Sequence, residues 1–148
     1  MRSLIAIAAL LASVSASAAE LDGKAILCQR DDYAGLPPYG YEFRDGKVYP
    51  HYVSTIDGGT RAIVATGEGV VDPYVYTAKV DVVEWDVGSY VLDRKTLAIS
   101  KSSLLDMAVL FTLTCELSPS VGAMKQAMEM HRQDKQRQID AEMEGNKI

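Results

Sequence analysis

The stretch VEWDVGSYVLDRKTLAIS, residues 83–100, decides the fold of this chain. Val83 and Trp85 share one face of an extended segment while Glu84 points to the other, and the alternation resumes twice, after DVGS and after DRKT. A period of two residues is typical of β-strands, whose successive side chains point to opposite faces. The stretch therefore predicts a three-strand meander with two tight connections.

Trp85 and Arg94 have structural roles in this meander. Trp85 is the only tryptophan of the chain, and we expect it on the core face because of its large apolar area. Arg94 is expected at the second tight turn, with its guanidinium stacked on an aromatic ring. We interpret both residues as parts of the architecture and not as a binding site.

Strand and turn patterns continue on both sides of the meander. KAILCQ (24–29) fits a first strand, and YEFRDGKVY (41–49) contains Asp-Gly between two alternating runs, which favours a hairpin. MAVLFTLTCEL (107–117) is a nearly continuous apolar run, as expected for a last strand covered on both faces. About seven or eight short strands without an intervening helix predict a mainly β fold, a small antiparallel up-and-down barrel. A sandwich is the alternative.

Two cysteines lie near the two ends of this strand region. In an up-and-down barrel the first and last strands are neighbours, so Cys28 and Cys115 would meet and form a disulfide. A crosslink across that much chain stabilises a small domain by about 4 kcal/mol in the chain-entropy model. The alternative, a reactive thiol, lacks a nearby basic residue or a C-x-x-C partner.

Residues 1–19 have the pattern of a secretory signal peptide. A positive start at Arg2, an apolar run and small residues before Glu20 match its three regions; a buried N-terminal helix is the alternative. We therefore expect a periplasmic or secreted protein with three segments: a signal peptide at 1–19, a β-barrel domain at 20–117, and an amphipathic helix with tail at 118–148.

Charge and motif content narrow the function classes. Cleavage removes Arg2 and no acidic residue, which changes the formal net charge from −5 to −6. An acidic exported domain without a basic run is a poor candidate for nucleic acid or for an anionic membrane surface, and no stable membrane insertion is expected. His51 and His131 lack metal-ligand spacing, no catalytic or phosphate-binding motif is present, and His51 is expected on a strand surface. We predict no enzyme, no metal and no cofactor, although residues distant in sequence can still assemble a catalytic site.

The period changes after Leu117. Ser118 is a candidate N-cap, Pro119 suits the first helical position, and Val121, Met124 and Met128 form an apolar stripe. The pattern predicts a helix that ends at 145, whose first half docks on the barrel and whose second half is solvated. A helix that binds a partner or drives oligomerisation is the alternative; the oligomeric state is left open.

These features together resemble a group of known proteins. Trp85, the pattern Tyr90-x-Leu92-Asp93-Arg94-x-Thr96-Leu97 and the late cysteine resemble small exported bacterial proteins with a lipocalin-like barrel and no established activity. Lipocalins carry Gly-x-Trp in the first strand, where this chain has Gly-Lys-Ala at 23–25, so the resemblance does not imply a deep ligand cup. A second resemblance is to the periplasmic inhibitor of c-type lysozyme, whose Ser-Gly loop corresponds to Gly-Ser, in reversed order, at 88–89.

The Pro-rich segment DDYAGLPPYG (31–40) is the candidate binding loop. Tyrosine combines apolar area with a polar tip, as binding surfaces require, and adjacent prolines make the backbone rigid. The predicted contact residues are Asp31, Asp32, Tyr33, Tyr39 and Tyr41, with the two acids favouring a cationic partner. We predict a non-catalytic module that binds an unidentified protein or small molecule through loops at one barrel end. The alternatives are an envelope-associated structural protein without ligand and a lysozyme-inhibitor-like protein.

Overall fold

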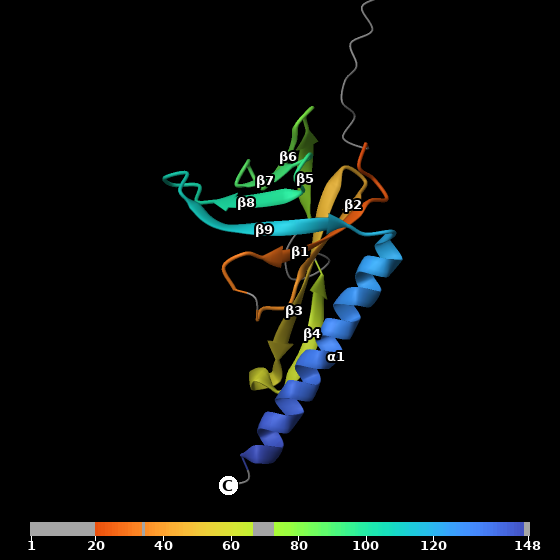
Figure 1. The fold of residues 1–148 in the computed structure, drawn as a ribbon, viewed down its shortest axis with the longest axis vertical. Coiled ribbons are helices and arrows are strands. Elements are labelled where there is room, and N and C mark those ends of the chain that lie inside the picture. Colours follow the sequence, from red (N-terminus) through yellow and green to blue (C-terminus); the bar gives the residue numbers. More distant parts are fainter. Residues whose placement is uncertain (1–19, 34, 67–72, 147–148) are drawn as a thin grey trace, which may run out of the picture.

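The computed structural model describes residues 20–33, 35–66 and 73–146 of the chain (Figure 1). The predicted signal peptide, residues 1–19, lies outside the described residues. The described part contains a short 3-10 helix (Asp57–Gly59), one α-helix, α1 (Val121–Gly145), and nine strands. The strands are β1 (Ala25–Arg30), β2 (Tyr39–Arg44), β3 (Lys47–Ile56), β4 (Arg61–Thr66), β5 (Tyr74–Ala78), β6 (Val82–Trp85), β7 (Tyr90–Asp93), β8 (Ala98–Ser102) and β9 (Val109–Leu117).

All the strands except β4 close into an antiparallel barrel. Each barrel strand pairs with the next one along the chain, and β9 returns to pair with β1. This order is the up-and-down arrangement, so the predicted mainly β barrel with a C-terminal helix is confirmed. The stretch that predicted the meander forms β6, β7 and β8, which pair in sequence.

One apolar cluster fills the space between the barrel strands. Trp85 is 2% exposed, and its ring stacks on that of Tyr90 with centroids 5.4 Å apart. Phe43 and Val48 are paired across the β2–β3 hairpin, and both belong to the same cluster. The tryptophan therefore lies in the core, where the sequence pattern places it.

A disulfide joins the first and last strands of the barrel. Cys28 lies directly opposite Cys115 in the β1–β9 ladder, with their Cα atoms 3.9 Å apart, and the two are bonded. Both residues belong to the core cluster. The crosslink therefore closes the seam of the barrel, as predicted from the spacing of the cysteines.

The strand that the sequence did not predict, β4, lies outside the barrel. The first part of β3 pairs with β2, whereas its last six residues pair with β4. Figure 1 shows β3 and β4 running away from the other strands, with α1 lying along them. The hairpin thus extends the sheet beyond the barrel and provides a surface for the helix.

The helix packs on the outer face of the sheet through its methionines. Met124 and Met128 are fully buried and contact Ala25 on β1. A Cβ atom on Gly40 would lie 2.4 Å from the Met124 sulfur, so only glycine permits this close approach of helix and strand. The predicted docking of the first half of the helix is thereby observed.

The start of the helix differs from the prediction. Ser120 is the N-cap, and its hydroxyl accepts a hydrogen bond from the Ala123 N–H at 3.0 Å. The Ser118 hydroxyl donates instead to the Ser120 carbonyl. The predicted cap at Ser118 is therefore wrong by two residues, because Pro119 precedes the first helical turn and does not occupy it.

The docked part of the helix extends to Ile139, which corrects the prediction of a solvated second half in part, since residues 140–146 are exposed. Ile139 is 6% exposed. Gln136 accepts a hydrogen bond from the Ala62 N–H at 2.8 Å and donates one to the Thr60 carbonyl at 3.1 Å. The cause is the β3–β4 extension, which continues the sheet beneath the helix.

Two smaller predictions also need correction. Strand β9 is covered on one face only, since the buried Leu113 and Cys115 alternate with the exposed Thr114 and Glu116. Arg94 does lie at the turn after β7, where its guanidinium donates to the Lys79 carbonyl and pairs with Glu20. The Arg94 guanidinium therefore has polar partners in place of the aromatic ring that was predicted.

Candidate functional site

The connections between barrel strands divide between two ends. One end carries the loops 31–38, 86–89 and 103–108, and we call it the apolar end; the other carries the turns 45–46, 79–81 and 94–97, and we call it the polar end. At the apolar end the Asp31 N–H donates to the Thr112 carbonyl and the Ser102 N–H to the Ser89 carbonyl. These bonds tie the loops 31–38 and 86–89 to the neighbouring strands β9 and β8.

The three predicted tyrosines do not share one surface. Tyr33 is 61% exposed, whereas Tyr39 is partly buried against the core cluster. Tyr41 is 4% exposed, and its ring lies 5.6 Å from that of Trp85. Period two explains the correction: Tyr41 falls on the inner face of β2, so it cannot contact a partner at the surface.

The two predicted acids are engaged within the chain. Asp31 accepts hydrogen bonds from the hydroxyls of Thr112 and Thr114, and these bonds hold its pKa below the usual value. Asp32 forms an ion pair with Arg30, which lowers its pKa in the same way. Asp31 therefore ties the loop to β9, and Asp32 keeps a charge that Arg30 partly offsets.

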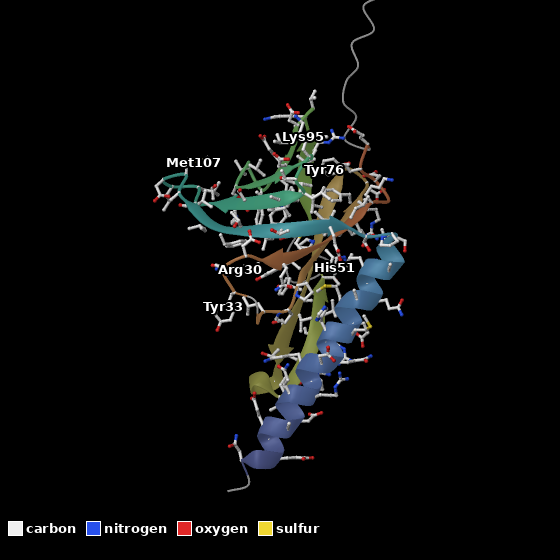
Figure 2. The ribbon with its side chains drawn as sticks, viewed as in Figure 1. Arg30, Tyr33, His51, Tyr76, Lys95 and Met107 are labelled. Atoms are coloured by element: carbon white, nitrogen blue, oxygen red, sulfur yellow. A yellow bond between two sulfur atoms is a disulfide. The ribbon has the colours of Figure 1, made fainter. Side chains whose placement is uncertain are left out.

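Exposed apolar side chains gather at this end of the barrel. Figure 2 shows Met107 at the far point of the β8–β9 loop and Tyr33 projecting from the neighbouring β1–β2 loop. The large apolar side chains exposed on the loops and on the start of β9, which we call the apolar tip, are Val87, Leu104, Leu105, Met107, Val109 and Leu110. A group of this kind marks an interaction surface more often than isolated apolar residues do.

Two residues of the apolar tip, Val87 and Met107, have a left-handed backbone conformation. Val87 has φ +56° although it is β-branched and 91% exposed. A valine is strained in this conformation, whereas asparagine or glycine accepts it at lower cost. Asp86 and Gly88 on either side also have positive φ, so the conformation belongs to the turn between β6 and β7, and burial of the valine side chain does not offset its cost.

Sequence reasoning missed the apolar tip because it assigned the whole run 107–117 to a buried strand. The available signal was Ser103 and Asp106, which bracket the leucines of SSLLDMAVLF with turn-forming residues. Ser103 does accept the Leu105 N–H, and Asp106 accepts the Ala108 N–H. The leucines are therefore held in a loop, outside the strand.

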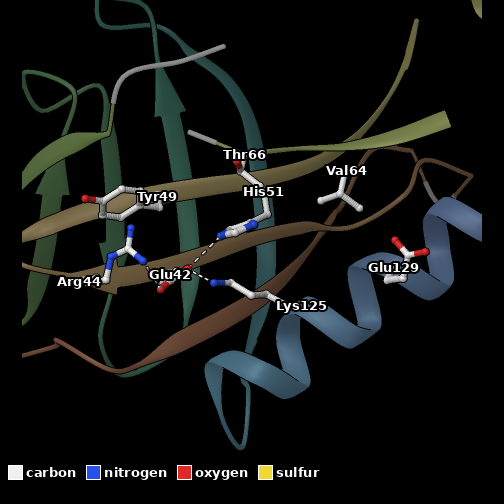
Figure 3. Close-up of a pocket in the computed structure, with 8 residues that line it drawn as sticks. All are labelled: Glu42, Arg44, Tyr49, His51, Val64, Thr66, Lys125 and Glu129. Carbon is white, nitrogen blue, oxygen red and sulfur yellow. Dashed lines mark hydrogen bonds and ion pairs between the residues drawn. The ribbon is translucent and has the colours of Figure 1, made fainter. Parts of the chain in front are cut away.

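A second site lies between the outer face of the sheet and the start of the helix. A pocket of about 290 Å³ lies there, and Figure 3 shows the polar side chains from β2, β3 and α1 that line it. Its centre is Glu42, which is 5% exposed. One Glu42 carboxylate oxygen lies 2.9 Å from Lys125 Nζ and 3.3 Å from His51 Nε2, and the other lies 3.5 Å from Arg44 Nη1.

Burial and charge set the protonation of this cluster. Burial alone would raise the pKa of Glu42, but the bond to Lys125 and the charges of Lys125 and Arg44 outweigh it and hold the pKa below 4.5. Burial lowers the pKa of His51 below 6.5, although the Glu42 carboxylate opposes the shift. At neutral pH the pocket therefore holds an ionised carboxylate, a neutral imidazole and two cations.

The walls of the pocket are mixed in character. Val64 and the ring of Tyr49 supply apolar area, and the Arg44 guanidinium lies 4.3 Å from the centre of that ring. Glu129 on the helix pairs with Arg132, whose bond lowers the pKa of that carboxyl. A cavity that joins apolar walls to a few fixed polar groups is typical of small-molecule sites.

Sequence reasoning missed this pair because His51 was expected on a strand surface and Glu42 was given no role. His51 is 4% exposed, since α1 covers the outer face of β2 and β3 at this point. A signal was present: a helix with an apolar stripe needs an apolar sheet face to cover, and any polar residue on that face becomes buried.

Other classes of site were also sought. Within the described residues, no group of three or more His, Cys, Asp or Glu side chains is arranged to hold a metal ion. Across 20–33, 35–66 and 73–146, no helix is long and apolar enough to cross a membrane. No protein-family model, curated protein or solved structure matches the chain.

Proposed function

We propose that this protein is an exported, non-catalytic binding module that recognises a partner protein through its apolar end. The observation that carries the proposal is the apolar tip, in which six large apolar side chains are exposed on two loops and on the start of β9. The export part rests on the signal-peptide pattern of residues 1–19 and on the disulfide, which is typical of oxidising compartments.

Charge around the apolar tip indicates the character of the partner. The described part of the apolar end carries four acids, Asp31, Asp32, Asp86 and Asp106, against two bases, Arg30 and Lys101, a net charge of −2. A partner with an apolar pocket inside a positively charged rim complements this arrangement. We therefore propose a basic protein.

The same charge argues against two other occupants. A second copy of this chain carries a net charge of −5 over its full sequence and would place acids against acids. An anionic bilayer attracts basic surfaces and repels this one. The apolar end thus fits a cationic protein better than it fits itself or a membrane.

Site-specific photo-crosslinking in the native host tests the proposal. A photoreactive phenylalanine analogue at position 105 should give one discrete adduct, whose mass identifies the partner. The matched control is the same analogue at Lys95, a highly exposed side chain at the polar end, which should give no such adduct. No adduct from position 105, equal adducts from both positions, or an adduct with the mass of a dimer would each contradict the proposal.

Binding of the purified partner then checks the chemistry. We expect Leu105→Ser to weaken binding by at least tenfold, since a buried anchor contributes more than about 1.4 kcal/mol. Raising the salt concentration should slow association if the partner is basic. If binding changes neither with the substitution nor with the salt concentration, the apolar end is not part of the interface.

A further inference from the structure

The pocket between the sheet and the helix contains buried charge that the proposed partner site does not use. Glu42 and His51 are each more than nine-tenths buried, at the outer face of β2 and β3. Burying a charge without function costs free energy even when it is paired. The buried charge in this pocket therefore has a cause separate from partner binding at the apolar end.

The cations stand closer to solvent than the carboxylate does. The side chains of Lys125 and Arg44 are 47% and 40% exposed, whereas that of Glu42 is 7% exposed. Figure 3 shows both cations directed toward Glu42 from different elements, the helix and β2. A molecule that enters the pocket thus meets positive groups before it meets the buried carboxylate.

The charged groups that line the pocket balance in number: Arg44 and Lys125 stand against Glu42 and Glu129, with His51 neutral. Two neighbours outside the lining complete the arrangement, since Glu129 pairs with Arg132 and Arg44 also pairs with Asp45. Because the Glu42 carboxylate is buried and Glu129 is engaged by Arg132, a ligand that enters the pocket meets the Lys125 and Arg44 cations first, which favours an anionic group.

Volume and walls limit the size of the anion. About 290 Å³ lies at the lower end of the range for small-molecule sites. Val64 and the Tyr49 ring suit a flat or short apolar group. An inorganic ion would leave these walls unused, whereas a molecule with several rings exceeds the space.

We propose that the pocket lined by Glu42, Arg44, Tyr49, His51, Val64 and Lys125 binds a small organic carboxylate with one apolar ring or short chain. The ligand carboxylate would lie between Lys125 and Arg44, and its apolar part would lie against Val64. Binding does not depend on the partner protein, so the two sites can be tested separately.

Benzoate titration followed by NMR of the folded mature protein tests this inference. We expect saturable shifts in the amides of β2, β3 and the first turns of α1. Neutral benzamide has the same shape and should bind at least tenfold more weakly. The pKa of His51, measured from the pH dependence of its imidazole signals, should also rise, because a second carboxylate nearby favours the charged imidazole.

Variants of two helix lysines provide the matched comparison. Lys125→Gln should weaken benzoate binding at least tenfold, Lys125→Arg should retain it, and Lys135→Gln, further along the same helix, should leave it unchanged. Arg44→Gln replaces Lys125→Gln if the latter does not fold. Equal binding of benzoate and benzamide, shifts confined to other elements, or full affinity in the folded charge variants would overturn the proposal.

Discussion

The two ends of the barrel use their connections in opposite ways. At the polar end, the turn after β7 is closed by the Asp93 carboxylate, which accepts the N–H groups of Lys95 and Thr96, both at 2.8 Å. At the apolar end, Leu105 and Met107 project from the loop between β8 and β9 and are 98% and 67% exposed. Figure 2 shows Lys95 and Met107 on different extremities of the molecule.

The turns at the polar end only connect strands, whereas the loops at the apolar end also expose large apolar side chains. A turn whose side chains satisfy its own backbone needs nothing from outside, and single exposed apolar residues such as Val80 at the polar end are ordinary. A loop that exposes several large apolar side chains presents apolar area that an external contact would bury. The contrast between the ends is therefore the main argument for recognition at one of them.

The largest expected effect comes from the core that both ends share. Trp85→Ala removes the ring that stacks on Tyr90 and packs against Phe43, and it should lower the free energy of unfolding by about 3 to 5 kcal/mol in urea titrations. Hydrogen exchange should accelerate at both ends together. Faster exchange at the apolar end alone would show that the two ends unfold separately and do not share one core.

As the pH falls, the pocket should begin to lose its contribution to stability at a higher pH than the polar end does. The folded pKa of His51 lies below 6.5 because of burial, so the unfolded chain binds more protons and stability falls as the pH drops from about 6.5 toward the folded pKa. The backbone N–H bonds of Asp93 lower its pKa from 3.8, so its contribution is lost only as the pH falls below that value.

Urea midpoints measured between pH 7.5 and 3.5 check this order. His51→Gln should remove the change in midpoint near and below pH 6.5. It should leave the change at lower pH, where Glu42, with its pKa held below 4.5, also loses its charge. A wild-type midpoint that stays constant from pH 7 to 5 would show that His51 does not limit stability, and that the pocket is not the first part of the molecule to respond to acid.

Replacement of the strained valine should stabilise the protein. Val87→Asn relieves the positive φ, with an expected gain of about 1 kcal/mol in the free energy of unfolding, while binding of the partner weakens. Opposite signs for stability and binding would sharpen the contrast between the ends. A loss of stability would instead mean that Val87 packs within the chain.

The smallest effect on stability is expected at the point of the loop. Leu105→Ser should change the free energy of unfolding by less than about 0.5 kcal/mol, because the side chain contacts solvent, although partner binding should be lost. Val80→Ser at the polar end is the matched control, since Val80 is 88% exposed; it should change neither quantity. Equal losses of binding in the two variants would remove the distinction between the ends.

Much of the barrel could be predicted from short patterns. Alternation around Trp85, the Asp-Gly hairpin at 45–46 and the two cysteines each depend on neighbours in sequence or on one topological rule, and all three agree with the structure. The helix boundary at 145 and the burial of Met124 follow from a period of 3.6 in the same way.

The candidate sites were harder to predict because they depend on what covers each face. Tyr41 was chosen for its chemistry, but its position on β2 turns it inward. His51 lies on the opposite face of β3, which would be solvated if α1 did not cross it. Val109 and Leu110 were assigned to a strand covered on both faces, because apolar character alone does not distinguish a buried strand from an exposed surface.

The bonds between Gln136 and β4 have a consequence for the order of folding. An edge strand with open N–H and carbonyl groups invites pairing with another chain, and the residue that closes the Ala62 N–H lies 74 positions later. A chain that emerges from its amino end therefore displays this edge throughout the synthesis or translocation of the remaining barrel. We expect that interval, before α1 arrives, to be the period in which the protein most needs a chaperone.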